Sequence, residues 1–189
     1  MHKPCRVIMG VDPGTNILGY GVIVVEGKKA SYLDMGVIDL RKVGDHFSKL
    51  NIILSEMGDL IDKYKPDDFA VEAPFYGKNP QVMLKLGRAQ GAALAAAFIR
   101  SVPVYEYAPK KVKMAITGRG AASKEQVALI LEKTLKTTLD TKYLDASDAL
   151  AIAMCHFYQL NNPLSDMDSS KSWEDFVKSH PDRLKKNNQ

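Results

Sequence analysis

Short hydrophobic segments separated by turn residues fill the first forty positions of the chain. Arg6–Asp12 is a mostly apolar run closed by Pro13-Gly14, which predicts a buried strand followed by a turn. Leu18–Val25 predicts a second strand and Ala30–Leu40 a third, joined by a tight turn at Glu26-Gly27-Lys28-Lys29. The chain is therefore expected to open with an antiparallel meander.

The spacing of apolar residues then changes to that of helices. From Asp45 to Tyr64 they recur every three or four positions, which is typical of an amphipathic helix. The remaining predicted elements are a strand at Asp68–Glu72, a long helix at about Asn79–Arg100, a strand at Val102–Tyr107, shorter helices from Pro109 and from Ser123, and a last helix beginning near Asp145.

Three antiparallel strands followed by alternating helices and strands predict an α/β fold with a five-stranded mixed sheet flanked by helices. The chain has 189 residues, enough for one domain with a sizeable core. We assign residues 1–160 to this domain. Residues 161–189 are polar and rich in turn residues, and we interpret them as a tail in which Trp173, Phe176 and Val177 could dock a short helix.

Composition excludes several classes of protein. The longest unbroken apolar stretch, Gly91–Ile99, is far shorter than the roughly 20 residues that span a bilayer, and the N-terminus lacks the layout of a signal peptide. We therefore expect neither a membrane protein nor a secreted one. Cys5 and Cys155 are too few for a disulfide framework and lack metal-ligand spacing, so we expect reduced thiols in a cytoplasmic protein.

Positive charge is concentrated in the middle of the sequence. The net formal charge is +4. Residues 77–142 carry 12 basic and 4 acidic side chains, whereas the parts before and after each carry two more acidic than basic side chains. Such a basic segment is typical of a surface that binds a polyanion, and a solvated lysine-rich face would have the same composition.

Four carboxylates stand where functional groups collect in α/β proteins. Asp12 and Glu72 each close a buried strand, and strand ends support side chains that project into a crevice. Asp145 and Asp148 are three residues apart, so a helix places both on one face. The alternative is a local role, in which the strand-end acids start turns and Asp145 is the N-cap of the last helix.

Convergence of these four acids would require a cation. Two unit charges about 4 Å apart repel by roughly 4 kcal/mol at an effective dielectric constant near 20. Oxygen ligands without His or Cys favour Mg²⁺, with Mn²⁺ as a substitute. The chemistry this predicts is phosphodiester hydrolysis with two ions, one activating water and one stabilising the leaving 3′ oxygen.

A set of short motifs follows in order along roughly residues 6–158. They are Gly10-Val-Asp-Pro-Gly-Thr15 with Gly19-Tyr-Gly21, Val71-Glu-Ala-Pro-Phe75, Lys85-Leu-Gly87, Tyr105-Glu-Tyr107, Val112-Lys113 and Asp145-Ala-Ser-Asp-Ala-Leu-Ala151. With this set the sequence resembles the RuvC family, bacterial Holliday-junction resolvases of the ribonuclease H-like superfamily. The whole set is far more specific than any single motif.

The resemblance implies roles for particular residues. The family's four metal-binding and catalytic acids fall on Asp12, Glu72, Asp145 and Asp148. Phe75 matches an aromatic residue that stacks on unpaired bases near the crossover, although packing at the core edge is an equal alternative. The further predicted DNA contacts are Tyr76, Lys78, Lys85, Arg88, Lys110, Lys111, Lys113, Arg119 and Lys124, each of which could instead be a solvated surface charge.

The resemblance also implies partners. Family members are homodimers that bind four-way DNA junctions, nick two opposing strands symmetrically with Mg²⁺ and work with the RuvAB branch-migration complex. A two-fold dimer suits that task. The expected function is thus a junction-resolving endonuclease of recombination and DNA repair in the bacterial cytoplasm.

Three other interpretations compete with this one. The Asp-Pro-Gly-Thr motif also resembles the first phosphate loop of actin-like ATPases, which need two lobes where this chain has one. The YqgF-like group of ribosomal RNA-processing proteins shares the opening acid motif but is shorter. A junction-binding protein without cleavage is disfavoured by the four acids. Arg88 and Gln90 stand in the reverse order to the family pattern, which leaves the DNA contacts of Lys85–Gly91 open.

Overall fold

The computed structural model describes residues 5–73, 79–139 and 144–161. The chain divides into two compact units, Met1–Tyr158 and Gln159–Gln189, and every strand of the described residues belongs to the first. Trp173, Phe176 and Val177, where the sequence allows a short docked helix, lie outside the described residues.

A five-stranded mixed sheet forms the centre of the first unit. Its strands are β1 (Cys5–Asp12), β2 (Ile17–Glu26), β3 (Lys29–Asp39), β4 (Asp68–Glu72) and β5 (Val104–Tyr107). They lie in the order β3-β2-β1-β4-β5, in which β2 is antiparallel to β1 and β3 while β1, β4 and β5 are parallel. The predicted α/β class, with an antiparallel meander at the start of the chain, is confirmed.

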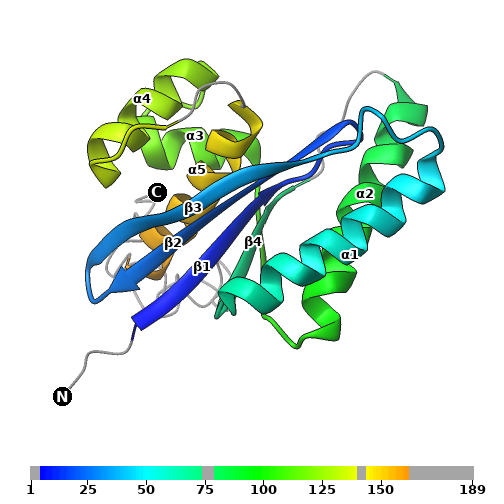
Figure 1. Ribbon diagram of the computed structural model, residues 1–189. Helices are drawn as coiled ribbons and strands as arrows, with labels where there is room; N and C mark the ends of the chain where they lie inside the picture. Colours follow the sequence, from blue (N-terminus) through cyan, green and yellow to red (C-terminus); the bar gives the residue numbers. More distant parts are fainter. Residues whose placement is uncertain (1–4, 74–78, 140–143, 162–189) are drawn as a thin grey trace, which may run out of the picture. The chain divides into compact units, whose positions relative to one another are not determined.

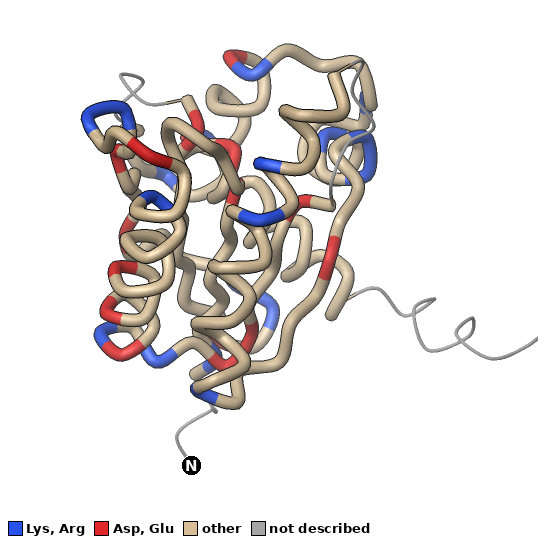
Figure 2. The backbone as a smooth tube through the Cα atoms, turned by 90° about the vertical axis from the view of Figure 1, so that its right-hand side faces the viewer, with Lys and Arg blue, Asp and Glu red and all other residues tan. Residues whose placement is uncertain are grey.

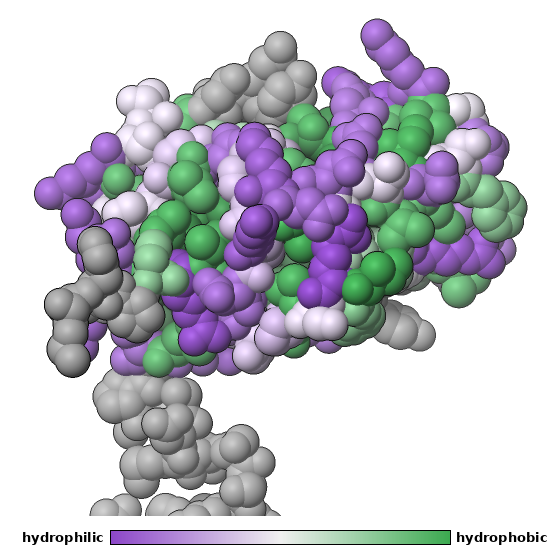
Figure 3. Space-filling model, turned by 60° about the horizontal axis from the view of Figure 1, so that its bottom comes forward, coloured by the Kyte–Doolittle hydropathy of each residue, from purple (hydrophilic) through white to green (hydrophobic). Residues whose placement is uncertain are grey.

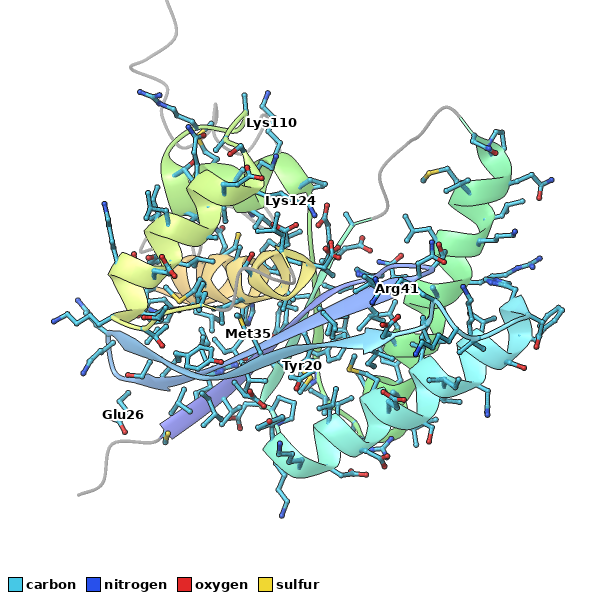
Figure 4. All side chains as sticks on the ribbon, turned by 45° about the horizontal axis from the view of Figure 1, so that its top comes forward. Tyr20, Glu26, Met35, Arg41, Lys110 and Lys124 are labelled. Atoms are coloured by element: carbon cyan, nitrogen blue, oxygen red, sulfur yellow. The ribbon has the colours of Figure 1, made fainter. Side chains whose placement is uncertain are left out.

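Four strands end at the same edge of the sheet. Because only β2 runs in the opposite direction, the carboxyl ends of β1, β3, β4 and β5 share one edge, at Asp12, Asp39, Glu72 and Tyr107. Figure 4 shows Glu26, the last residue of β2, at the opposite end of the strands. The carboxyl edge is where functional side chains of α/β sheets gather.

Helices cover both faces of the sheet (Figure 1). The helices α1 (His46–Tyr64) and α2 (Pro80–Ile99) pack on one face. The helices α3 (Pro109–Thr117), α4 (Lys124–Leu135) and α5 (Leu144–Leu160) pack on the other. Side chains of β1 alternate between the two cores: Ile8 belongs to the α5 side, and Met9 and Val11 belong to the α1–α2 side. Apolar residues on both faces explain why β1 is an unbroken hydrophobic run.

Glycines let α5 lie directly against the sheet. A Cβ atom at Gly10 would stand 2.1 Å from the carbonyl oxygen of Ala149, and one at Gly19 would stand 2.1 Å from the carbonyl oxygen of Asp145. Both distances are far inside van der Waals contact, so these strand positions exclude every larger residue. The Gly19 contact fixes the first turn of α5, which carries Asp145, one turn before Asp148.

The predicted boundaries agree with the structure to within one residue, except at the start of the fifth strand. The fifth strand begins at Val104 instead of Val102, because the Val102 amide donates to the carbonyl oxygen of Ala97 at the end of α2 and Pro103 has no N–H to donate to a neighbouring strand. The last helix begins at Leu144, so Asp145 lies inside its first turn. The alternative that Asp145 is the N-cap is therefore wrong.

One helix of the described residues, α2, is long and apolar enough to cross a membrane by length and composition. Ala89, Ala93, Ala96 and Ala97 bury one side of α2 in the core shared with α1 and the sheet. A helix packed into a protein core meets the same criteria of length and hydropathy. The two cysteines are free thiols, Cys5 exposed and Cys155 buried.

Candidate active site

Two of the predicted acids stand next to each other at the carboxyl edge of the sheet. Asp12 is the last residue of β1 and Glu72 the last residue of β4, and the two strands pair in parallel up to Val11 and Val71. Both side chains are partly buried and line the same pocket. Strand pairing thus brings together two residues that are 60 positions apart in the sequence.

The first two turns of α5 supply the other two acids. One carboxylate oxygen from each of Asp12, Asp145 and Asp148 can be chosen so that the three lie within 4.8 Å of one another. Glu72 lines the pocket beside Asp12 and Asp148. The structure therefore brings all four predicted acids to one place, from the ends of two strands and the start of one helix.

Lys124 enters this group from α4. Its Nζ atom lies 2.5 Å from Oδ2 of Asp148 and 3.2 Å from Oδ1 of Asp145. A capping box fixes the start of α4: the Ser123 hydroxyl accepts from the Gln126 amide, and the Gln126 side chain accepts from the Ser123 amide. Figure 4 shows Lys124 reaching from α4 toward the strand ends, with Lys110 at the upper edge of the molecule.

A pocket of about 330 Å³ surrounds the acids, and we call it the acidic pocket. It is lined by Asp12, Glu72, Pro109, Val112, Lys113, Lys124, Val127, Asp148 and Ala151. The apolar members come from α3, α4 and α5, and the two lysines line the same pocket as the carboxylates. Apolar lining lowers the local dielectric constant and strengthens every charge interaction inside the pocket.

Burial and mutual repulsion raise the pKa of three of these carboxyls. The pKa of Asp12 rises to about 8, first because the group is buried and then because Glu72 and Asp148 are negatively charged. Burial followed by the charge of Asp148 raises the pKa of Glu72. Burial also raises the pKa of Asp148, against the effect of its bond to Lys124. Without a cation, the pocket therefore favours protonated acids.

The donor set fits a hard divalent cation. Three carboxylate oxygens lie within 4.8 Å of one another, and the described residues that line the pocket include no His or Cys. Oxygen ligands of this kind suit Mg²⁺ and Mn²⁺. The raised pKa of Asp12 also indicates a cation site. A positive charge at this place would offset the repulsion from Glu72 and Asp148, which together with burial raises this pKa.

The predicted DNA-binding residues spread over several elements. Lys85 and Arg88 are exposed on α2, Lys110 and Lys111 are exposed on α3, and Arg119 is exposed after α3. Lys113 and Lys124 differ from these exposed residues because they line the acidic pocket together with the carboxylates. Phe75, Tyr76 and Lys78 lie outside the described residues.

One supporting residue escaped sequence analysis. Gln90 is buried, and its side-chain amide donates to the carbonyl oxygen of Glu72 at 3.1 Å and to the carboxylate of Glu106 at 2.9 Å. It thereby anchors the backbone that carries Glu72. The only signal in the sequence is a polar residue inside the alanine-rich stretch of α2, and that signal does not identify its partner.

A mixed sheet with acids gathered at its carboxyl edge, flanked by lysines, defines a nuclease of the ribonuclease H-like class. Residues 8–156 match the family model described as crossover junction endodeoxyribonuclease RuvC. The chain therefore belongs to the RuvC family.

Individual relatives agree with this assignment. The chain is 52% identical to a crossover junction endodeoxyribonuclease RuvC of Christiangramia forsetii, over 97% of this chain and 95% of the relative. It is 51% identical to that of Cytophaga hutchinsonii, over 95% of this chain and 88% of the relative. Among solved structures it resembles Thermus thermophilus RuvC in complex with Holliday junction substrate, with 36% identity, a TM-score of 0.74, and coverage of 81% of this chain and 94% of that one.

Proposed function

We propose that this protein resolves Holliday junctions by nicking two opposing DNA strands in a reaction that depends on Mg²⁺. The observation that carries the proposal is the grouping of Asp12, Glu72 and Asp148 in one pocket, with Asp145 beside Asp12 and Asp148, in a chain that belongs to the RuvC family. Such cleavage serves recombination and DNA repair. The family match favours this function over ribosomal RNA processing, and the complete set of acids favours it over junction binding without cleavage.

Asp12, Glu72, Asp145 and Asp148 would hold the metal, which we propose to be two Mg²⁺ ions that Mn²⁺ can replace. When bound, such ions supply a nucleophilic water at neutral pH and stabilise the leaving 3′ oxygen. The protein's own contribution is the rigid placement of the carboxylates. Asp12 and Glu72 stand on paired strands, and Gly19 fixes the height of Asp145 above the sheet.

The lysines of the acidic pocket hold and orient the phosphate that is cut. The carboxyl partners of Lys124 raise the pKa of its ammonium against the opposing effect of burial, so this group keeps its charge at every physiological pH. Lys113 stands on α3 at the same pocket. Two fixed cations beside a metal cluster neutralise the charge that develops on the phosphate during cleavage.

The exposed basic residues of α2, of α3 and of the segment that follows α3 would contact the DNA backbone on either side of the cut. These are Lys85, Arg88, Lys110, Lys111 and Arg119, with Lys78 in the segment that precedes α2. Phosphate contacts of this kind fix register and orientation without reading sequence. We further propose that Phe75, assisted by Tyr76, stacks on bases that the junction leaves unpaired.

A homodimer would provide the two active sites that symmetric nicking needs. Three large apolar residues of α2 that line no pocket at the carboxyl edge of the sheet are strongly exposed: Leu84 at 58%, Phe98 at 61% and Ile99 at 71%. Figure 3 shows hydrophobic residues interspersed with hydrophilic ones on the face that it presents. Leu84, Phe98 and Ile99 are candidates for a surface covered by a second copy.

The cellular setting follows from the proposed substrate. We propose that the protein works in the bacterial cytoplasm with the RuvAB branch-migration complex. Residues 1–160 would form the nuclease domain, in keeping with the family match over residues 8–156. We assign no function to residues 161–189.

The decisive experiment offers the protein a synthetic four-way junction, a matched duplex, single-stranded DNA and a structured RNA in Mg²⁺. We expect symmetric nicks in the junction alone. Cleavage of the RNA instead would support a ribosomal RNA-processing role, and binding of the junction without cleavage would support an inert binder.

A further inference from the structure

A second pocket opens at the carboxyl edge of the sheet, on the α1–α2 side. It has a volume of about 300 Å³ and is lined by Thr15, Asn16, Gly44, His46, Lys49, Val82 and Lys85. We call it the basic pocket. Its lining among the described residues contains two lysines and no carboxylate. The proposed cleavage chemistry does not use it.

The turn between β1 and β2 joins the two pockets. Asp12 ends β1 in the acidic pocket, and Thr15, three residues later, lines the basic pocket. A chain extends at most about 3.6 Å per residue, so the two backbone positions are within roughly 11 Å of each other. A DNA strand rises about 3.4 Å of helix axis per nucleotide. Asp12 and Thr15, one residue from each pocket, are therefore no farther apart than a few nucleotides of one strand.

The donors of the basic pocket are fixed in place by its own hydrogen bonds. The Nζ atom of Lys49 donates to the carbonyl oxygen of Thr15 and to Oδ1 of Asn16, both at 3.0 Å. These contacts use two of the three N–H donors of Lys49. Because Oδ1 of Asn16 accepts from Lys49, the other end of the amide is the NH₂ group, which can only donate. The arrangement supplies positive charge and N–H donors without an acceptor of opposite charge.

Neighbouring charges cancel this positive charge only in part. Asp45, which precedes α1 and caps it by accepting from the Ser48 amide and hydroxyl, keeps its single negative charge, against the two lysines of the pocket. Asp39 at the end of β3 is paired with Arg41 at 2.6 Å. Lys85 belongs to α2, which contains basic residues and no acidic one, as Figure 2 shows.

We propose that the basic pocket binds a backbone phosphate of the same DNA strand that is cut in the acidic pocket, within a few nucleotides of the cut. Lys49 and Lys85 provide the charge, and Asn16 provides an N–H donor. The inference rests on the proposed function, because it takes the substrate to be DNA. It assigns Lys49 and Asn16 to the DNA-binding surface and gives Lys85 a defined role.

The first test measures how junction binding depends on salt, in EDTA, so that no cleavage occurs. Each phosphate contact to duplex DNA contributes about 0.9 to the slope of log affinity against log salt concentration, and about 0.7 for a single strand. We expect Lys85→Gln and Lys49→Gln each to lower the slope by up to this amount, because both lysines contact the same phosphate. Lys28→Gln removes the same charge from the β2–β3 turn at the opposite edge and should leave the slope unchanged. Unchanged slopes for Lys85→Gln and Lys49→Gln would overturn the proposal.

The second test locates the phosphate. Neutral methylphosphonates replace, one at a time, the three phosphates on each side of the cut. We expect one position to weaken binding of the wild type and to have a smaller effect on Lys85→Gln, since both changes remove the contact of Lys85 with that phosphate. If no position behaves in this way, the pocket does not bind the cut strand. Lys85→Gln carries this test because Lys49 also supports the Thr15 turn and its loss could disturb folding.

The wild-type protein separates failure of this proposal from failure of the proposed function. If the wild type nicks junctions but the two lysine variants keep its slope and its methylphosphonate profile, only the basic pocket is misassigned. If the wild type neither prefers the junction nor cuts it, the proposed function fails and the phosphate site fails with it.

Discussion

The acidic pocket and the basic pocket have similar volumes and share one edge of the sheet, yet they are built in opposite ways. The acidic pocket joins side chains from β1, β4, α3, α4 and α5, and its carboxyls are buried enough for their pKa values to rise. The basic pocket is lined by residues from two loops and two helices, and Lys85 is exposed. Metal-dependent cleavage needs buried carboxylates that are held close together. Binding of a DNA strand needs positive charges that stay accessible to its phosphates.

The strongest test of this contrast separates cleavage from binding. Asp148→Asn keeps the shape of the side chain but removes a charged oxygen from the acid group. Loss of groups that merely support a metal ligand costs about 10- to 100-fold, so loss of a ligand should lower the rate of junction cleavage by more than about 100-fold. Junction affinity in EDTA should not fall. Nicking gels and a binding titration on the same preparation measure both.

Lys85→Gln should have the reverse pattern. We expect weaker junction binding at physiological salt and a cleavage rate close to that of the wild type once the junction is saturating. If Asp148→Asn retained cleavage, or if Lys85→Gln lost it at saturation, the division of labour between the two pockets would be wrong.

Sequence analysis succeeded where local pattern decides structure. Asp68–Glu72 was predicted with its observed ends, because a short apolar run between turn residues has few alternatives. The grouping of Asp12, Glu72 and Asp148 followed from their places at strand ends and at the start of a helix. The order of strands and helices along the chain sets those places, and this order can be predicted from the local sequence pattern.

Sequence analysis failed where a contact depends on tertiary packing. Gln90 anchors Glu72 from across the α2–β4 interface, and Lys49 reaches the turn at Thr15 from α1, so neither partner is visible in sequence spacing. Asp68 is a further example: it is a buried acid paired with Arg6 and lies 3.4 Å from Nε2 of His156. Its sequence position at a strand start resembles that of any turn residue.

The next largest effect is expected at the contact between β2 and α5. Gly19→Ala would push its new methyl group against the carbonyl oxygen of Asp145 and move the first turn of α5 away from the sheet. We expect a loss of stability of about 1–3 kcal/mol and weaker cleavage at limiting Mg²⁺. Urea unfolding and a Mg²⁺ titration of cleavage measure the two effects.

Gly91→Ala is the matched control for Gly19→Ala. Gly91 lies inside α2 with open space around it, so alanine should stabilise the helix by up to about 1 kcal/mol. Equal behaviour of the two variants would show that α5 does not depend on the close approach at Gly19.

The metal-free acidic pocket should destabilise the fold. In the folded protein the pKa of Asp12 is about 8, above its ordinary value of 3.8, so between these pH values the folded state binds more protons than the unfolded state. Stability in EDTA should therefore fall as pH rises from about 4 to 8. Asp12→Asn should reduce this fall, leaving the contributions of Glu72 and Asp148, and should be more stable than the wild type at pH 8. Thermal melts of both proteins across this pH range measure the difference, and a stability difference between Asp12→Asn and the wild type that does not grow with pH would contradict the repulsion.

The smallest effect is expected at Gln90. Gln90→Met keeps the length of the side chain but removes the N–H that donates to the carbonyl oxygen of Glu72. We expect the Mg²⁺ concentration for half-maximal cleavage to rise by about 10-fold or less, with the rate at saturating Mg²⁺ nearly unchanged. Gln81→Met on the exposed first turn of α2 is the control. A lower rate at saturating Mg²⁺ with no change in metal requirement would argue against a positioning role.

The most direct test of the central claim measures proton release when metal binds. Because the pKa of Asp12 is about 8, its carboxyl is mostly protonated at pH 7 and must lose its proton to become a ligand. Calorimetric titration with Mn²⁺ at pH 7, repeated in buffers of different ionisation enthalpy, counts the protons. We predict release of close to one proton from the wild type and much less, with weaker binding, from Asp12→Asn. Binding of equal affinity and equal proton count in the two proteins would contradict the assignment of the acidic pocket as the metal centre.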